Sequence, residues 1–231
     1  MPVIGYLGVG PPIADNLSGL RKGLSEHGFA EGRNVTIEFR NTEQYDRLPA
    51  LATELVRLRV AVIVTAANVN AAQAARAATE TIPVVFTLGN NPVRVGLVPS
   101  LNRPGGNATG VTFFAQELQA KRLELLRELV PKATTIAVLT NPNNAVNELN
   151  TGETQAMLRG IGQQVVVSGA STAKEIEMAF ATFAQQQAGG LLIVGDAFFN
   201  SRMDQVVELA ARYRIPTIHF EARFTRAGGS R

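Results

Sequence analysis

Two stretches of this 231-residue chain repeat one pattern about half a chain apart, and this repeat constrains the fold most strongly. Ile82-Pro83-Val84-Val85-Phe86 and Ile215-Pro216-Thr217-Ile218 each place a proline at the start of an apolar run. Proline is tolerated at the first residue of a strand, where its missing N–H costs little. The prolines lie 133 positions apart (83 to 216), and the apolar runs at Val3 and Thr135 lie 132 apart. The repeat predicts two lobes wound in the same way, although short apolar runs also recur by chance in chains of this kind.

Short apolar runs alternate with segments whose apolar residues recur at helical spacing. The expected strands are Val3–Leu7, Val35–Phe39, Ala61–Val64, Val84–Phe86, Thr135–Leu139, Gln164–Val167, Leu191–Val194 and Thr217–His219. The expected helical stripes are Leu17, Leu20 and Leu24; Leu48, Leu51, Leu55 and Leu58; Leu118, Leu123, Leu126 and Leu129; and Ile176, Ala179, Phe180 and Phe183. This alternation predicts an α/β fold of two Rossmann-like lobes with parallel sheets covered on both faces. We place an N-terminal lobe at residues 1–112 and a C-terminal lobe at residues 113–231, after the turn-rich Arg103–Asn107.

Three local signals predict helix ends. Thr172 with Glu175 fits a capping box, and Ser201 with Asp204 approximates one. Gly28 follows His27 where a glycine commonly ends a helix, and a histidine suits the negative end of the helix dipole.

The bulk composition excludes several functional classes. Hydrophobic residues make up 45% of the chain and charged residues 18%, so a sizeable core is expected. The net charge is +3, and no basic run is interleaved with aromatic residues, so we predict no nucleic-acid partner. No apolar stretch reaches membrane-spanning length. The chain has no cysteine and only two, distant histidines, so we predict no disulfide and no metal site.

Catalytic and cofactor motifs are also missing from the sequence. Gly8-Val9-Gly10 follows the first strand like the start of a dinucleotide fingerprint, but a third glycine is absent and Pro11-Pro12 interrupts the turn. No phosphate loop, nucleophile elbow or pair of carboxylates occurs at a strand end. His219 ends a predicted strand, where packing is a better interpretation than ligand contact. We therefore predict no cofactor and no enzymatic activity.

Polar residues at strand ends are better suited to binding. In open parallel sheets, ligands bind at the carboxyl ends of the strands. The residues predicted to contact a ligand there, or at the lobe junction, are Gly10, Asn68, Asn90, Asn91, Phe113, Asn141, Asn144, Asp196 and Phe198. The amides of Asn141 and Asn144 serve equally well as ligand contacts or as helix caps. Asp196, beside Phe198, suits an ammonium group with an apolar tail; the alternative is an N-cap for a helix after Asn200.

Six stretches match a known family in the family's own order. They are Tyr45-Asp46-Arg47-Leu48-Pro49-Ala50-Leu51-Ala52, Thr81-Ile82-Pro83-Val84-Val85-Phe86, Gly96-Leu97-Val98, Arg103-Pro104-Gly105-Gly106-Asn107-Ala108-Thr109-Gly110, Lys121-Arg122-Leu123-Glu124-Leu125-Leu126 and Glu208-Leu209-Ala210-Ala211. On these residues the chain resembles the bacterial ABC-transporter substrate-binding proteins that include tryptophan/tyrosine-binding members. The resemblance implies a type I periplasmic-binding fold, a small amino-acid-like or organic-acid ligand in the inter-lobe cleft, a periplasmic location and delivery to an ABC permease. It also implies that Asn141-Pro142 with Asn144 is the family's Asn-Pro loop, and that Asp196 is its cleft aspartate.

The sequence departs from this family in two loops and near its end. Asn90-Asn91-Pro92 replaces a Gly-Asp-Pro turn and Asn68-Val69-Asn70 a Gly-Thr-Pro turn, so two ligands stay open: an aromatic amino acid, as in known members, or another amino acid. Family members continue past Ala227-Gly228-Gly229 with a segment that returns to the first lobe. Without it we expect uncovered apolar surface on that lobe and a tendency to form homo-oligomers. The opening residues Met1–Tyr6 resemble a strand, so a signal peptide is expected to be absent from this sequence.

Two alternative functions remain open at this point. One is a cytosolic small-molecule sensor or effector module, which needs a partner domain. The other is a bilobed α/β isomerase, which needs an acid and a base facing each other, whereas the loops offer only Asp196.

Overall fold

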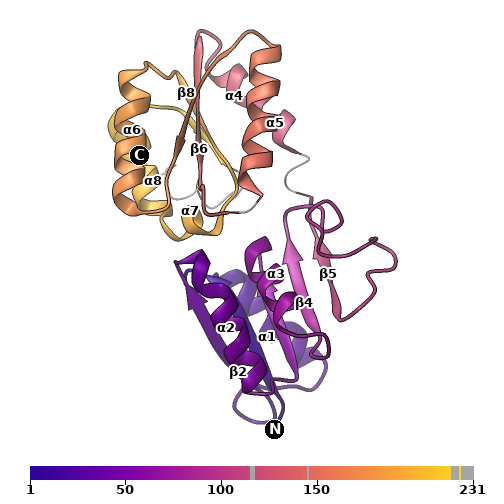
Figure 1. Ribbon diagram of the computed structural model, residues 1–231. Coiled ribbons are helices and arrows are strands. Elements are labelled where there is room, and N and C mark those ends of the chain that lie inside the picture. Colours follow the sequence, from indigo (N-terminus) through magenta and orange to yellow (C-terminus); the bar gives the residue numbers. More distant parts are fainter. Residues whose placement is uncertain (115–117, 145, 220–223, 225–231) are drawn as a thin grey trace. The chain divides into compact units, whose positions relative to one another are not determined.

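The computed structural model describes residues 1–114, 118–144, 146–219 and 224. The chain divides into two compact units, Met1–Phe114 and Ala115–Arg231. Each unit contains one sheet whose strands all pair in parallel, with helices packed against it (Figure 1). The predicted α/β class with parallel sheets is therefore confirmed.

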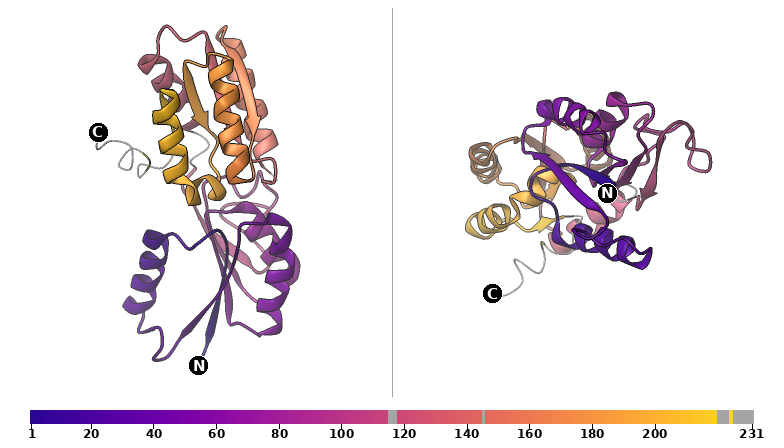
Figure 2. Two further views of the ribbon diagram at one scale, coloured as in Figure 1. Left: turned by 90° about the vertical axis from the view of Figure 1, so that its left-hand side faces the viewer. Right: turned by 90° about the horizontal axis from the view of Figure 1, so that it is seen from below.

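The first unit has a five-stranded sheet in the order β2-β1-β3-β4-β5. Its elements are β1 (Val3–Val9), α1 (Ala14–Glu26), β2 (Thr36–Thr42), the short 3-10 helix η1 (Tyr45–Arg47), α2 (Leu48–Arg57), β3 (Val62–Ala66), α3 (Val69–Ala78), β4 (Val84–Leu88) and β5 (Ala108–Thr112). Helix α1 covers one face of the sheet, and α2 and α3 cover the other (Figure 2). Leu17, Leu20 and Leu24 of α1 pack against a core that includes Ile4 and Tyr6, as their helical spacing predicts.

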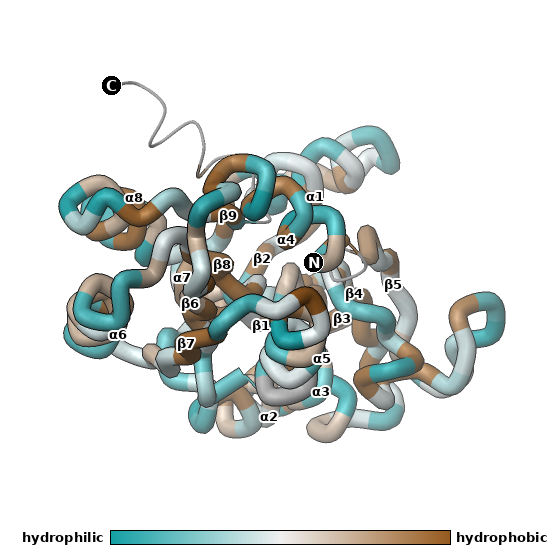
Figure 3. Tube along the Cα trace, turned by 90° about the horizontal axis from the view of Figure 1, so that it is seen from above, coloured by the Kyte–Doolittle hydropathy of each residue, from teal (hydrophilic) through white to brown (hydrophobic). Residues whose placement is uncertain are grey.

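The second unit has a four-stranded sheet in the order β7-β6-β8-β9. Its elements are α4 (Gln119–Leu129), β6 (Thr135–Thr140), α5 (Asn147–Gly160), β7 (Gln164–Gly169), α6 (Ala173–Gln185), β8 (Gly190–Ile193), α7 (Ala197–Ser201), α8 (Met203–Tyr213) and β9 (Thr217–Ile218). Helices α4 and α5 lie on one face of this sheet and α6 and α8 on the other (Figure 1). Hydrophobic residues concentrate on β6, β7 and β8 between these layers (Figure 3).

The repeat in the sequence corresponds to a repeat in the winding. The first four strands of each unit follow the same order, with the second strand at the edge and the first strand beside it. Pro83 directly precedes β4, and Pro216 directly precedes β9. The prediction that both halves are wound alike is therefore confirmed, and the chance interpretation of the repeat is wrong.

Several local expectations need correction. Strand β5 was not expected, because Ala108–Thr112 carries no apolar run. Ser201 caps no helix; its hydroxyl donates to the carbonyl of Phe198 at 2.8 Å, and α8 begins after Arg202 without a side-chain cap. Leu118 and Leu129 are exposed rather than part of the α4 core face.

Two of the predicted helix ends are confirmed. Thr172 and Glu175 form the capping box of α6, with both of its hydrogen bonds present. Gly28 follows the C-cap His27 of α1 with a φ of +83°, a conformation that favours glycine.

Apolar side chains are exposed on the β4–β5 side of the first unit. Val85 lies on β4 and Val111 on β5, where 64% of Val111 is exposed. Phe113 follows β5 and is 54% exposed. The oligomeric state expected from this surface stays a prediction. Within the described part of the chain, every helix is too short or too polar to cross a bilayer.

Candidate functional site

The carboxyl ends of β6 and β8 bring together three of the predicted residues. Asn141 and Asn144 follow β6, and Asp196 follows β8 by three positions. Because β6 and β8 are parallel neighbours, the two loops emerge at the same edge of the second sheet. All three residues are buried, with 1% of Asn141 and 3% of Asp196 exposed.

The carboxylate of Asp196 accepts three hydrogen bonds in this cluster. Asn141 Nδ2 donates to Oδ1 at 2.9 Å, and Asn144 Nδ2 donates to Oδ2 at 2.7 Å. The backbone N–H of Phe198 donates to Oδ1 at 2.9 Å, so Asp196 is also the N-cap of α7. The sequence offered Asp196 as a cap for a helix that begins after Asn200. The helix that Asp196 caps begins at Ala197 instead. Two donors from the loop after β6 and one from the N-terminus of α7 therefore converge on this one carboxylate.

The two asparagines are themselves fixed by the loop that carries them. Asn141 Oδ1 accepts from the N–H of Asn143 at 3.0 Å, and Asn144 Oδ1 accepts from the N–H of Val146 at 3.2 Å. Asn147 Nδ2 donates to the carbonyl of Asn141 at 3.2 Å. Each amide thus has its oxygen on the loop backbone and its nitrogen on Asp196. The protein's own hydrogen bonds therefore set the orientation of both amides.

Four predicted residues lie at the carboxyl ends of strands in the first unit. Gly10 follows β1 with a φ of +70°, and its N–H donates to the carbonyl of Thr42 at 3.0 Å. Asn68 follows β3 and caps α3, accepting from the N–H of Ala71 at 2.8 Å. Asn90 and Asn91 follow β4. These residues share one edge of the first sheet, as the parallel strand order requires.

The side chains at this edge also have local partners. Asn68 Nδ2 donates to the hydroxyl of Tyr45 at 3.4 Å. Asn91 Oδ1 accepts from the N–H of Val93 at 3.0 Å and from that of Arg94 at 3.3 Å, which makes it a turn-forming residue. The carbonyl of Asn90 accepts from the Thr112 hydroxyl at 2.9 Å and ties the loop to β5.

The two predicted aromatic contacts differ in exposure. Phe198 is 2% exposed, and its ring lies 5.5 Å from that of Phe199 between centroids. The guanidinium carbon of Arg202 lies 5.9 Å from the Phe198 centroid. Phe113 is largely exposed next to the boundary between the two units. Phe113 is therefore exposed, whereas Phe198, like Asn141 and Asp196, is buried.

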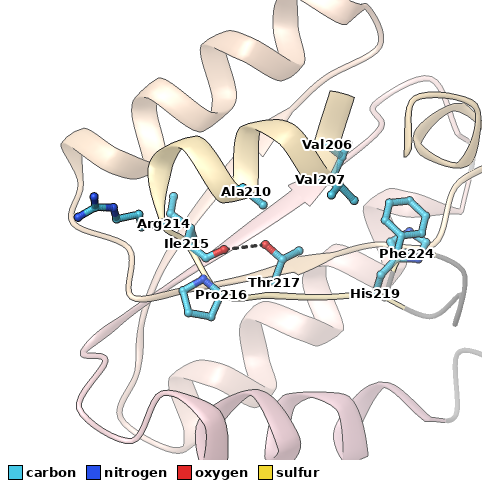
Figure 4. A pocket seen from close by; sticks show the side chains of 10 residues that line it. Val206, Val207, Ala210, Arg214, Ile215, Pro216, Thr217, His219 and Phe224 are labelled. Atoms are coloured by element: carbon cyan, nitrogen blue, oxygen red, sulfur yellow. Dashed lines mark hydrogen bonds between the residues drawn. The ribbon is translucent and has the colours of Figure 1, made fainter. Parts of the chain in front are cut away.

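A separate pocket of about 540 Å³ lies between α8 and β9 in the second unit (Figure 4). Its lining is mainly apolar and includes Val206, Ala210, Ile215 and Thr217. The ring of His219 stacks on that of Phe224 at its end, with centroids 3.6 Å apart. None of the nine predicted ligand residues lines this pocket, so we do not assign the ligand to it.

Sequence reasoning missed several residues that hold the predicted ones. In the second unit, Asn147 donates to the Asn141 carbonyl, and the Thr151 hydroxyl donates to Thr140 at 2.9 Å at the end of β6. In the first unit, Tyr45 accepts from Asn68. The sequence signal that could have identified Asn147 and Thr151 is the row of polar residues at helical spacing in α5, on the face that is buried. Among the described residues, no group of three or more His, Asp or Glu side chains is arranged to hold a metal ion.

Comparison with known proteins assigns the family. The family model for ABC transporter substrate binding proteins matches residues 9–230, and the chain belongs to this family. A tyrosine-binding protein of Clostridioides difficile is 29% identical over 219 residues, which cover 94% of this chain and 62% of the relative. The chain thus spans about three fifths of the length of that curated relative.

Two solved structures confirm the type I periplasmic-binding fold. A conserved domain protein from Vibrio cholerae has a TM-score of 0.86 and 23% identity, with 98% of this chain and 76% of that chain covered. A domain from Streptococcus pneumoniae in complex with L-Trp has a TM-score of 0.78 and 24% identity, with 94% and 72% covered.

Proposed function

We propose that this chain is the extracytoplasmic solute-binding component of an ABC importer and that it delivers a small amino-acid-like or organic-acid ligand to a permease. Membership of the substrate-binding family supports a binding function. The tyrosine-binding relative and the structure with bound L-Trp favour an aromatic amino acid as the ligand class. The isomerase and sensor alternatives have no comparable support.

The observation that carries this proposal is the Asp196–Asn141–Asn144 cluster. Asp196 supplies negative charge, and the oriented amides supply both donors and acceptors at one sheet edge. A ligand with an ammonium and a carboxylate group matches such a mixture, because each of its charged ends finds groups of the required polarity. We propose that Asp196 and Asn141 recognise the polar end of the ligand.

The first unit contributes further contacts in this proposal. Gly10 offers close backbone approach, and Asn68, Asn90 and Asn91 offer amide groups at the carboxyl edge of the first sheet. Phe113, which is exposed, is proposed to contact an aromatic ring. Because Asn91 is neutral, this edge favours ligands with no second positive charge.

A thermal-shift screen tests the proposal. L-tyrosine, L-tryptophan and 4-hydroxybenzoate are added to the purified chain, with D-tyrosine and glycine as matched controls. A ligand present at about 100 times its Kd stabilises the folded protein by about 2.7 kcal/mol. We expect the melting temperature to rise by several degrees with one aromatic compound and not with glycine. An unchanged melting temperature with all three compounds at millimolar concentration contradicts the proposed ligand class.

A further inference from the structure

The buried face of α5 changes from polar to apolar along its length. The buried residues on this face are Asn147, Asn150, Thr151, Thr154 and Leu158, at the spacing of a core-facing helical stripe. Such positions ordinarily carry apolar side chains. Here the first two turns, nearest Asn141, are polar, and only the last residue is apolar.

These polar groups form two hydrogen-bonded chains of side chains, one that reaches Asn147 and one that reaches Asn150. One chain starts at the site: Asn141 donates to Asp196, and Asn147 Nδ2 donates to the Asn141 carbonyl at 3.2 Å. The other chain starts on α4 and joins Arg122 to α5. Its bonds run from Arg122 Nη1 to Gln119 Oε1 at 3.2 Å, from Gln119 Nε2 to Thr154 Oγ1 at 2.6 Å, and from Thr154 Oγ1 to the Asn150 carbonyl at 2.8 Å.

The two hydrogen-bonded chains end at Asn147 and at the carbonyl of Asn150, and the side chains of these two residues carry complementary buried atoms. Asn147 Oδ1 is a buried acceptor and Asn150 Nδ2 is a buried donor, and neither has a hydrogen-bond partner among the described residues. The two residues are three positions apart on one helix, so their Cβ atoms are about 5–6 Å apart. This spacing suits a single bridging molecule that hydrogen-bonds to both amides. Buried polar groups in folded proteins nearly always find a partner, and ordered water is a common one.

We propose that one buried water molecule bridges Asn147 and Asn150. It accepts a hydrogen bond from Asn150 Nδ2 and donates one to Asn147 Oδ1. The bridge joins the two chains into one polar connection from Arg122 on α4 to Asp196. Asn147 and Asn150 then act as positioning residues, because the water fixes the Asn147 amide that holds the Asn141 carbonyl.

Two measurements on the ligand-free protein test this proposal, so its outcome does not depend on the identity of the ligand. In a nitrogen-edited NOESY or ROESY experiment, the side-chain amide protons of Asn150 should show a cross-peak to a long-lived water. A crystal structure at high resolution should show one water within hydrogen-bond distance of both Asn147 Oδ1 and Asn150 Nδ2. A direct hydrogen bond between the two amides, or a dry contact with no water cross-peak, overturns the proposal.

A variant pair extends the test. Asn150→Leu removes the donor, and Thr151→Val is the control, because its hydroxyl lies on the same buried face but bonds to Thr140. We expect the bound water to be lost in N150L and retained in T151V. The backbone N–H of Asn144 donates to the same Asn141 carbonyl that Asn147 contacts. This N–H should exchange with solvent at least about fivefold faster in N150L than in T151V. If the water stays in folded N150L, the bridge is wrong; if N150L does not fold, the two measurements on the unmodified protein decide.

Discussion

Asn144 Nδ2 donates to Asp196 Oδ2 at 2.7 Å, across 52 positions of sequence. This bond joins the loop after β6 to the loop after β8, and both belong to neighbouring parallel strands. The same carboxylate caps α7 through the N–H of Phe198. One side chain therefore sets the geometry of the candidate site and also stabilises the helix beside it.

Replacement of Asp196 by asparagine tests this double role. The amide NH₂ group of the variant faces either the Asn144 donor or the donors of Asn141 and Phe198, so at least one buried donor loses its acceptor. We expect the free energy of unfolding to fall by about 1.5–3 kcal/mol, the range for hydrogen bonds to charged groups. Urea denaturation measures the change. Asp204→Asn, the same substitution at an exposed position of α8, should change it by less than about 0.5 kcal/mol; equal effects of the two variants would refute the network.

The capping box of α6 predicts an acid-dependent contribution to stability. Hydrogen bonds from the backbone N–H and hydroxyl of Ser171, and from Thr172, lower the pKa of Glu175 below its ordinary value of 4.5. A lowered pKa in the folded state gives stability that is present above pH 4.5 and is lost as the pH falls through the folded pKa. Glu175→Gln should remove this part of the acid dependence.

The measurement for the capping box is the urea midpoint as a function of pH from 3 to 7. Glu177→Gln is the matched control, since Glu177 is exposed on the same helix. Thr172→Ala, which removes the other half of the box, should cost about 1 kcal/mol at neutral pH. A Glu175→Gln variant that keeps the full acid dependence of the unmodified protein would show that the box does not hold in solution.

Two glycines predict opposite responses to the same change. A Cβ at Gly110 in β5 would overlap the backbone oxygen of Phe86 and lie 2.6 Å from its Cδ2, so Gly110→Ala should destabilise the first unit by about 1–3 kcal/mol. At Gly19 in α1 a Cβ meets nothing within 4 Å, and Gly19→Ala should stabilise by about 0.5–1 kcal/mol because alanine favours the helix. Thermal unfolding of both variants checks the signs. A tolerated Gly110→Ala would contradict the position of β5 beside β4.

The hydroxyl of Thr65 makes a further prediction about stability. Thr65 in β3 is fully buried, and its Oγ1 has no hydrogen-bond partner within the part of the chain that the structure describes. Thr65→Val keeps the shape and removes the unpaired group, so we expect a gain of about 1 kcal/mol. Thr154→Val is the contrast: that hydroxyl bonds to both Asn150 and Gln119, and its loss should destabilise by about 1–2 kcal/mol. Denaturation in urea separates the two, and a loss of stability in Thr65→Val would mean that the hydroxyl is paired.

Much of the fold follows from patterns visible in the chain. The apolar runs at Val3–Leu7 and Thr135–Leu139, and the prolines at 83 and 216, are local signals, and the strands lie where these signals place them. Strand β5 was missed because an edge strand that is exposed on both faces needs no apolar run; its middle residues Thr109, Gly110 and Val111 are all exposed. Its position depends on pairing with β4, which local sequence does not encode.

The candidate site was predictable only in part, because its hydrogen bonds also join residues that are far apart in the sequence. Strand-end position alone pointed to Asn141, Asn144 and Asp196, since parallel strands gather their carboxyl ends at one edge. The cap on α7 was assigned to a later helix because Ala197–Ser201 is short and mostly buried, with no polar face to reveal its period. Asn147 and Asn150 were missed because polar residues in a helix are ordinarily assigned to the solvent side.

Isothermal titration of the purified chain with L-tyrosine and L-tryptophan, compared with the Asp196→Asn and Asp204→Asn variants, tests the central claim most directly. Circular dichroism confirms first that each variant is folded. The account predicts saturable one-to-one binding of at least one of these amino acids, weakened tenfold or more by Asp196→Asn and less than twofold by Asp204→Asn. Binding that is unchanged in Asp196→Asn would show that Asp196 is not part of the binding site, and no binding of either amino acid would contradict the proposed ligand class.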